Sequence, residues 1–328
     1  MKVALHEHGL IGFHDYWLRK QVGNLKANVL QLIAEECFGK KLDLVAIASQ
    51  YEEGQIDDLS TGLIHDRFGY LCREGERLPE EYSVDSDGRG LLVVKKHGQK
   101  VTLLNAQSVR VRSNGRRIDT IIVGDNRTPV GRPIDYILDY SGERGFINIA
   151  EHIAAPDLYS LGDDIERFFE KYDAFEWNAQ MIIFPWMTRM PFVGKAIKSA
   201  CRDNNNQVLE KAQKLDKPVV AVGDSHRIED IGVANIYLSK PFGNLVDCEI
   251  DKLCSEAVLS HLKEAIRQRE FTNNYGLQSF FGLINWRLIY VGGVKVYLGE
   301  DALPEGQRQK GDVRLGYKNL FLKGFRNQ

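Results

Sequence analysis

The chain of 328 residues has no apolar run of the length that crosses a bilayer, about eighteen residues or more. Its N-terminal stretch also lacks the pattern of a secretory signal peptide. The net charge of -2 gives no overall bias toward nucleic acid or anionic membranes. These absences predict a cytoplasmic protein without a membrane partner.

Cysteine is scarce: five residues are scattered along the chain, and none forms a Cys-x-x-Cys pair. This pattern does not indicate a disulfide framework, so we expect reduced and mostly buried thiols. No internal repeat or low-complexity segment is present. Hydrophobic residues make up 43% and charged residues 27% of the chain, which is typical of a globular protein with one large or two ordinary domains.

Strand and helix patterns alternate along most of the chain. An apolar run near the N-terminus precedes helical periodicity at 21–38, and 42–48 is a nearly continuous apolar run typical of a strand buried on both faces. Further helices are expected at 133–140, 161–172, 193–215 and 251–269, and further strands at 145–150, 174–178, 217–222 and 233–238. Repeated βα units over residues 1–270 predict a parallel sheet, either a barrel or a doubly wound sheet.

Two segments depart from this alternation. Residues 52–125 carry turn signals at 85–88 and 113–115 between strand-like runs, which predicts a β-rich insertion with hairpins. Residues 271–328 form a C-terminal extension with a strand-like run at 290–297 and no assignable fold.

Polar side chains follow several of the predicted strands. His6 and His8 end the first strand, and two histidines separated by one residue point to the same side of an extended backbone. Both imidazoles can then reach one cation. The other polar groups at strand ends are His152, Glu176 with Asn178, and Asp224 with His226. The alternatives are surface histidines near a flexible terminus and, for Asp224, a helix cap.

These motifs resemble the polymerase and histidinol phosphatase (PHP) superfamily. The resemblance is carried by His6-Glu7-His8, the strand 43–48, the segment 149–152 and Gly223-Asp224-Ser225-His226 with the following Ile231-Gly232. It covers residues 1 to about 270 and implies a distorted TIM-like (β/α)7 barrel. It also implies hydrolysis of phosphate esters at a cluster of divalent metal ions, Zn, Mn, Fe or Mg, at the strand ends.

The resemblance assigns roles to individual residues. The metal ligands that it implies are His6, His8, His14, His152, Asp224 and His226. A bound cation lowers the pKa of water and polarises a phosphoryl oxygen, and His152 or His226 is then a ligand or a general acid beside Asp224. Arg227, Arg110 and Arg112 are candidates for contacting the substrate phosphate, with solvated surface charge as the alternative.

Two positions depart from the family pattern. Gln50 stands where a metal-binding histidine is expected, and a neutral amide is a poor ligand for transition metals. The bridging glutamate of the family aligns with Gln107, or alternatively with Asp125. We therefore expect one or two metal ions rather than three. A barrel that has lost catalysis and acts as a binding or scaffold module is the competing interpretation.

The substrate is expected to be a phosphorylated small molecule or a nucleic acid. Basic residues gather at 95–119 and in the tail from 308, where aromatic residues are interleaved with them. Solvated faces are the alternative reading of both segments. The apolar stretch 182–192 contains two prolines and is expected either as core or as a lid in which Trp186 covers the site.

Overall fold

The computed structural model describes residues 1–8, 28–51, 66–113, 116–125, 127–129, 132–153, 161–179, 195–225, 228–240 and 254–276. At 50–51, 112–113, 116–117, 195–204 and 229 the description is confined to the backbone. Within these residues no helix combines the length and the apolar character needed to cross a membrane.

In the part of the chain that the structure describes, eleven strands form one sheet. They are β1 (Lys2–Glu7), β2 (Leu44–Tyr51), β3 (Tyr82–Ser86), β4 (Leu91–Lys96), β5 (Gln99–Ser113), β6 (Arg116–Val123), β7 (Ile147–Ala150), β8 (Ala174–Asn178), β9 (Val219–Val222), β10 (Asn235–Leu238) and β11 (Phe271–Asn274). The helices are α2 (Val29–Gly39), α3 (Arg67–Gly75), α4 (Ile134–Glu143), α5 (Ile165–Phe168), α6 (Lys195–Lys214) and α7 (Ser255–Arg267).

The sheet curls into a nearly closed barrel. β1, β2 and β5 are parallel neighbours, β7, β8 and β9 are parallel neighbours, and β6 lies antiparallel between the two groups. A parallel bridge between Glu7 and Ser225 joins the ends of β1 and β9. Backbone bonds from His8 N to Ser225 O (2.9 Å) and from Asp224 N to His6 O (2.8 Å) hold this seam. The seam therefore brings the two chain segments with the strongest metal-binding signal together.

The opposite end of the seam is closed by β10 and β11, which extend the sheet antiparallel beside β1. Between β11 and β9 the side chain of Asn273 makes hydrogen bonds to the backbone of β9. Its Oδ1 accepts from Ala221 N at 2.8 Å and its Nδ2 donates to Val219 O at 2.7 Å. Asn273 thereby ties β11 to β9.

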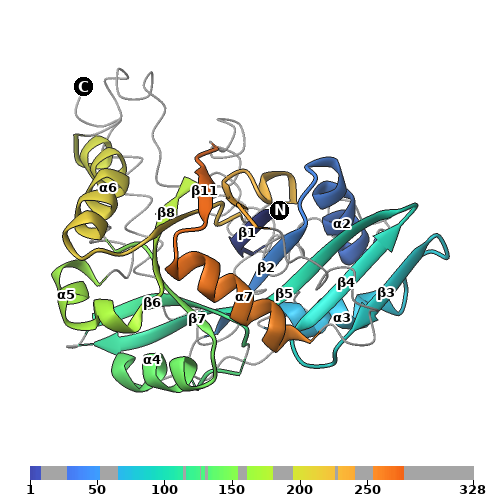
Figure 1. Ribbon diagram of the computed structural model, residues 1–328, viewed down its shortest axis with the longest axis horizontal. Coiled ribbons are helices and arrows are strands. Elements are labelled where there is room, and N and C mark those ends of the chain that lie inside the picture. Colours follow the sequence, from blue (N-terminus) through green and yellow to red (C-terminus); the bar gives the residue numbers. More distant parts are fainter. Residues whose placement is uncertain are drawn as a thin grey trace, which may run out of the picture.

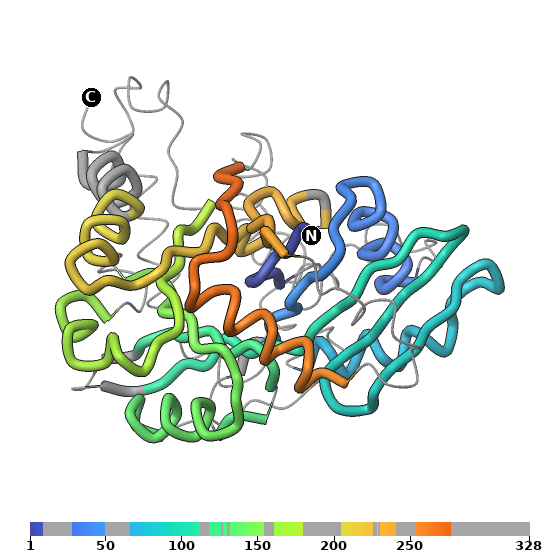
Figure 2. Tube along the Cα trace, in the orientation of Figure 1, coloured from blue at the N-terminus to red at the C-terminus, as the bar shows by residue number. Residues whose placement is uncertain are grey.

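Apolar side chains fill both faces of the curved sheet. The interior cluster includes Val3, Leu44, Ile121 and Val222, together with Leu262 of α7, which lies across the strands in Figure 1. Two outer clusters lie under α2 and α3 on one side and under α4, α5 and α6 on the other. Figure 2 shows these helices on the periphery of the sheet.

Several expectations from the sequence are confirmed. The buried runs at 42–48, 174–178 and 217–222 form β2, β8 and β9, and the patterns at 133–140, 193–215 and 251–269 form α4, α6 and α7 within a few residues. The mixed α/β class and the barrel-like sheet also agree with the prediction, whereas the (β/α)7 count itself is not shown.

Other expectations need correction. Residues 52–125 are β-rich, yet β5 and β6 belong to the barrel sheet itself and α3 is a helix, so the segment is not merely an inserted hairpin unit. β5 has two partners on one edge, β4 along its first half and β6 along its second, which local turn signals do not reveal. The sheet is also not wholly parallel, because β6 and β10 run antiparallel.

Two helix boundaries also differ from the prediction. The helix expected at 21–38 begins only at Val29, because Asn28 is extended and caps it by accepting from Gln31 N at 3.2 Å. The helix expected at 161–172 is divided into a 3-10 turn, the single turn of α5 and a second 3-10 turn. The strand-like run at 290–297 and the rest of the extension from 277 lie outside the described residues.

Candidate metal centre

A β-bulge in β1 turns His6 and His8 toward the barrel interior. Val3 pairs with Leu44 and Ala4 with Val45, but Glu7 pairs with Ile47. From one pair to the next, β1 therefore advances three residues, from Ala4 to Glu7, while β2 advances two, from Val45 to Ile47. Strict alternation from Val3 would point Glu7 inward and both imidazoles outward. The extra residue places Leu5 and His6 on the same inner face and restores alternation one position later.

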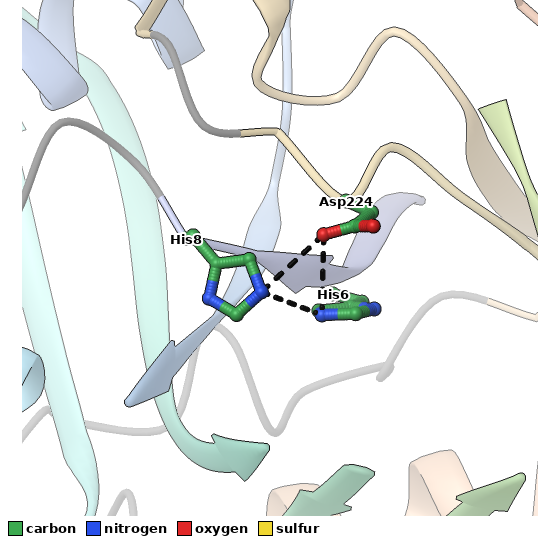
Figure 3. A group of neighbouring side chains, drawn as sticks. All are labelled: His6, His8 and Asp224. Atoms are coloured by element: carbon green, nitrogen blue, oxygen red, sulfur yellow. Dashed lines mark hydrogen bonds and ion pairs between the residues drawn. The ribbon is translucent and has the colours of Figure 1, made fainter. Parts of the chain in front are cut away.

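Three ligand atoms converge at the end of the seam (Figure 3). His6 Nε2 lies 3.0 Å from His8 Nε2 and 3.6 Å from Asp224 Oδ1, and His8 Nε2 lies 3.3 Å from the same oxygen. All three residues are buried. Ligands bonded to a tetrahedral zinc ion at about 2.0 Å are about 3.3 Å apart, so the three separations fit the edges of such a site.

The second nitrogen of each imidazole is held by a neighbouring oxygen. His6 Nδ1 lies 2.8 Å from Glu176 Oε2, and His8 Nδ1 lies 3.0 Å from the carbonyl oxygen of Ala48. That carbonyl also accepts from Arg67 Nη1 at 2.9 Å, and the guanidinium contacts the His8 ring. At His6, donation from Nδ1 to the Glu176 carboxylate directs the Nε2 lone pair of the neutral imidazole at the shared point, as in metal sites with ordered outer partners. At His8, the Nδ1 atom lies beside both the Ala48 carbonyl oxygen and the Arg67 guanidinium, and these contacts hold the ring in place.

His152 lies on the other side of the Asp224 carboxylate. Its Nε2 is 3.2 Å from Glu151 Oε1 and 3.7 Å from Asp224 Oδ2, and its Nδ1 is 3.2 Å from Glu176 Oε1. His152 is not one of the three converging ligand residues. Both His152 and Asp224 have left-handed backbones, with φ of 48° and 47°, a conformation that non-glycine residues adopt mainly where their surroundings enforce it.

Buried charges dominate the electrostatics of this centre. Burial alone would lower the pKa of His6, but the carboxylates of Asp224 and Glu176 outweigh it and raise the pKa to about 10. Burial alone would raise the pKa of Glu176, but His6 and His152 hold it at about 2. The pKa of His152 also lies well above its ordinary value, because Glu151 and Glu176 outweigh its burial. Without a metal, these carboxylates thus retain protons on the imidazoles; a cation would take over that neutralising charge.

Glu7 points away from the centre and holds the loop that carries Asp224. Its carboxylate accepts from Ser225 N at 3.2 Å and from Gly232 N at 2.9 Å. Burial raises the pKa of Glu7 to about 7 despite these hydrogen bonds. The middle residue of the His-x-His motif is therefore a support for the opposite side of the seam.

The two residues that align with the bridging glutamate of the family, Gln107 and Asp125, both lie outside the centre. Gln107 is on the outer face of β5, where its Oε1 accepts from Thr128 N at 3.0 Å. Asp125 organises the following turn by accepting from Arg127 N at 2.8 Å. Glu176 of β8 instead places a carboxylate oxygen 2.8 Å from His6 Nδ1.

Arg110 is engaged within the protein. Its Nε and Nη2 donate to the two carboxylate oxygens of Asp119 at 2.7 and 2.8 Å, a bidentate pair between β5 and β6. A contact between Arg110 and a substrate phosphate stays a prediction. At Arg112 and Gln50 only the backbone is described; the register pairs Gln50 with Ser108 of β5. His14, Trp186, His226 and Arg227 lie outside the described residues.

Two residues of the centre had no role in the sequence prediction. Glu176 had been noted only as a polar residue at a strand end, and its alternation with the interior residue Ala174 is the signal that places it inside the barrel. Arg67 lies in the segment interpreted as an insertion, and nothing in its local sequence indicates a contact with His8.

No protein-family model and no curated protein matches this chain. Among solved structures, PsfC from Pseudomonas syringae PB-5123 aligns over 82% of this chain and 98% of its own, with 16% identity and a TM-score of 0.48. A two-domain protein from Bacteroides vulgatus ATCC 8482, described as containing a predicted PHP-like metal-dependent phosphoesterase, aligns over 84% of this chain and 65% of its own, with 10% identity and a TM-score of 0.47. Both likenesses are too remote to transfer a family or an activity to this chain.

Proposed function

We propose that this chain is a metal-dependent hydrolase that cleaves phosphate esters. The observation that supports this most is the convergence of His6 Nε2, His8 Nε2 and Asp224 Oδ1 at the seam of the barrel. Three protein ligands leave a coordination position open, as catalytic rather than purely structural metal sites do. Active sites of β/α barrels also gather at the ends of parallel strands, where these residues lie.

The donor set suits Zn, Mn or Fe, and Mg less well, because imidazole nitrogen is a ligand for the transition metals. When bound, a divalent cation supplies polarisation of the phosphoryl group and a water of lowered pKa. We propose one or two cations, with His14 and His226 as further ligands from the segments that follow His8 and Ser225 in the sequence.

The residues around the cation site have separate tasks in this proposal. The Nε2 atom of His152 lies between Glu151 Oε1 and Asp224 Oδ2, and His152 is the candidate for delivering a proton to the leaving oxygen. Asp224 holds the cation with one oxygen and faces His152 with the other. Arg227 and Trp186 are proposed to contact the substrate, the first through its phosphate and the second as part of a lid.

We further propose that the fold is the distorted seven-stranded barrel of the PHP superfamily, spanning residues 1–270 with the extension 271–328 after it. The support is the ring of β1, β2, β5, β6, β7, β8 and β9, with the His-x-His and Asp-x-His motifs on its adjoining ends.

A phosphorylated small molecule is the substrate class that we favour over nucleic acid. Three cations of the basic segment 95–119 are paired within the protein: Lys95 with Asp85 at 3.1 Å, Lys96 with Glu35 at 2.7 Å, and Arg110 with Asp119 at 2.7 Å. Such pairs weaken the field that would attract a polyanion.

The test is hydrolysis of p-nitrophenyl phosphate by the purified chain with added Mn²⁺ or Zn²⁺. We expect metal-dependent turnover that Asp224→Asn abolishes and Asp173→Asn preserves, because Asp173 is an equally buried carboxylate that binds Arg267 rather than the imidazoles. A wild-type chain that recruits metal but hydrolyses no phosphomonoester or phosphodiester would refute the proposal. A chain that recruits no metal would instead support the binding or scaffold module.

A further inference from the structure

One carboxylate contacts two of the three imidazoles that lie beside Asp224. Glu176 Oε2 lies 2.8 Å from His6 Nδ1, and Glu176 Oε1 lies 3.2 Å from His152 Nδ1. Glu176 is fully enclosed in the barrel, so water cannot replace either contact. The two histidines come from different strands, β1 and the end of β7, and Glu176 of β8 is the group that they share.

Asn178 shows which groups donate in this network. Its Nδ2 has two hydrogens and lies 2.6 Å from Glu176 Oε1 and 3.0 Å from Asp224 Oδ2. Both hydrogens therefore have carboxylate acceptors, so the 3.3 Å contact with His152 Nδ1 is not a donation from Asn178. The proton between His152 and Glu176 then belongs to the imidazole.

The consequence is that the two Nε2 atoms approach Asp224 from different sides. With Nδ1–H of each histidine directed at Glu176, His6 Nε2 lies 3.6 Å from Asp224 Oδ1, and His152 Nε2 lies 3.7 Å from Asp224 Oδ2 and 3.2 Å from Glu151 Oε1. We infer that Glu176 is a positioning residue that fixes the tautomer and the orientation of His6 for cation binding and of His152 for proton transfer. The His152 half of this inference rests on the proposed function, whereas the His6 half requires only a cation site.

A glutamine at this position would keep the size of the side chain while removing its negative charge. Its amide has one acceptor oxygen, so it cannot accept from both imidazoles while also accepting from Asn178. Outer partners of metal-binding histidines typically contribute about 10–100-fold to metal affinity. An aspartate retains two acceptor oxygens on a shorter side chain and serves as the conservative replacement.

The first experiment uses the metal-free protein, labelled with ¹⁵N at histidine. We expect the Nδ1–H protons of His6 and His152 to be protected from exchange with water in the wild-type chain and in Asp173→Asn. In Glu176→Gln we expect at least one of the two signals to be lost. Protection of both signals in Glu176→Gln, or equal loss in Asp173→Asn, would overturn the inference without reference to metal or catalysis.

The second experiment titrates each protein with Zn²⁺ by calorimetry. We expect Glu176→Gln to raise the Kd by about 10–100-fold, Glu176→Asp to raise it less, and Asp173→Asn to leave it unchanged. At saturating Zn²⁺, His152→Gln should lower kcat without raising the Kd, whereas Glu176→Gln should change both. An unchanged Kd in Glu176→Gln overturns the inference, and a wild-type chain that binds Zn²⁺ without hydrolysing esters overturns the proposed function alone.

Discussion

At the scale of single residues, Gly223 leaves the space that the Glu7 carboxylate occupies beside Asp224. A Cβ at position 223 would lie 2.6 Å from Glu7 Oε1, which is closer than van der Waals contact allows. The carboxylate cannot easily move aside, because the backbone N–H groups of Ser225 and Gly232 hold it.

We therefore expect Gly223→Ala to displace Glu7 or Asp224 and to weaken Zn²⁺ binding by about 10–100-fold, the range for outer partners of a metal site. Gly142→Ala is the matched control, since nothing lies within 4 Å of its added Cβ and it lies within α4. The control should stabilise the chain by up to about 1 kcal/mol and leave the Kd unchanged. Wild-type affinity in Gly223→Ala would show that Glu7 does not fix the loop.

Residue types at strand ends identified the main members of the centre but not all of their partners. His6, His8 and Asp224 can be identified from the sequence because each lies at the end of an apolar strand and belongs to a motif. The alignment of motifs points to Gln107 or Asp125 and not to Glu176, because it does not say which face of a strand a side chain occupies. Alternation along β8 would have placed Glu176 inside the barrel once Ala174 was known to face inward.

At the scale of elements, the bulge in β1 decides whether the His-x-His motif faces the site. Leu5 is the extra inward-facing residue, and it is fully buried in the interior cluster. Deleting Leu5 would remove the bulge while leaving His6 and His8 on the inner face, because alternation would then run directly from Ala4 to His6.

We expect the Leu5 deletion to lose about 2–5 kcal/mol of stability, the typical contribution of a buried leucine side chain, and to retain Zn²⁺ binding. Urea unfolding and calorimetry measure the two effects separately. Loss of binding in a variant that remains as stable as the wild type would contradict this account of the bulge.

Periodicity predicted most elements but not how they join. A bulge leaves no local signature in an apolar run of a few residues. The sequence of residues 3–8 therefore does not show on which face of the strand His6 and His8 lie. One edge of β5 pairs first with β4 and then with β6, and local turn signals do not show where one partner ends and the next begins. For that reason the hairpin signals at 52–125 suggested an insertion where the chain builds part of the barrel.

At the scale of the whole molecule, the buried charges of the centre link stability to pH. The pKa of His6 is raised from 6.5 to about 10, so its stabilising contribution is complete below pH 6.5 and is lost as the pH rises through 10. The pKa of Glu176 is lowered from 4.5 to about 2, so its contribution is complete above pH 4.5 and is lost as the pH falls through 2. Both contributions are complete between pH 4.5 and 6.5.

Metal binding should shift the pH of greatest stability upward, because imidazole must lose a proton before it can act as a ligand. We expect Zn²⁺ to raise the melting temperature little near pH 5 and increasingly toward pH 8. At a free concentration of 100 Kd the stabilisation should reach about 2.7 kcal/mol. Thermal scans with and without Zn²⁺ across this range measure it; a Zn²⁺ effect independent of pH would contradict ligation by His6 and His8.

The barrel class followed from repeated βα patterns, whereas the seam that forms the site did not. The bonds between His6, His8, Asp224 and Ser225 join residues more than 200 positions apart, beyond the reach of any local pattern. The placement of both motifs at the ends of predicted parallel strands, together with their resemblance to one family, indicated that these segments meet.

The most direct measurement is anomalous diffraction from a crystal of the full chain soaked with Zn²⁺. The account predicts a peak about 2.0–2.2 Å from His6 Nε2, His8 Nε2 and Asp224 Oδ1, and no peak there in Asp224→Asn soaked in the same way. The absence of a peak among these three atoms at saturating Zn²⁺, or a peak held by other residues while all three stay unbound, would contradict it.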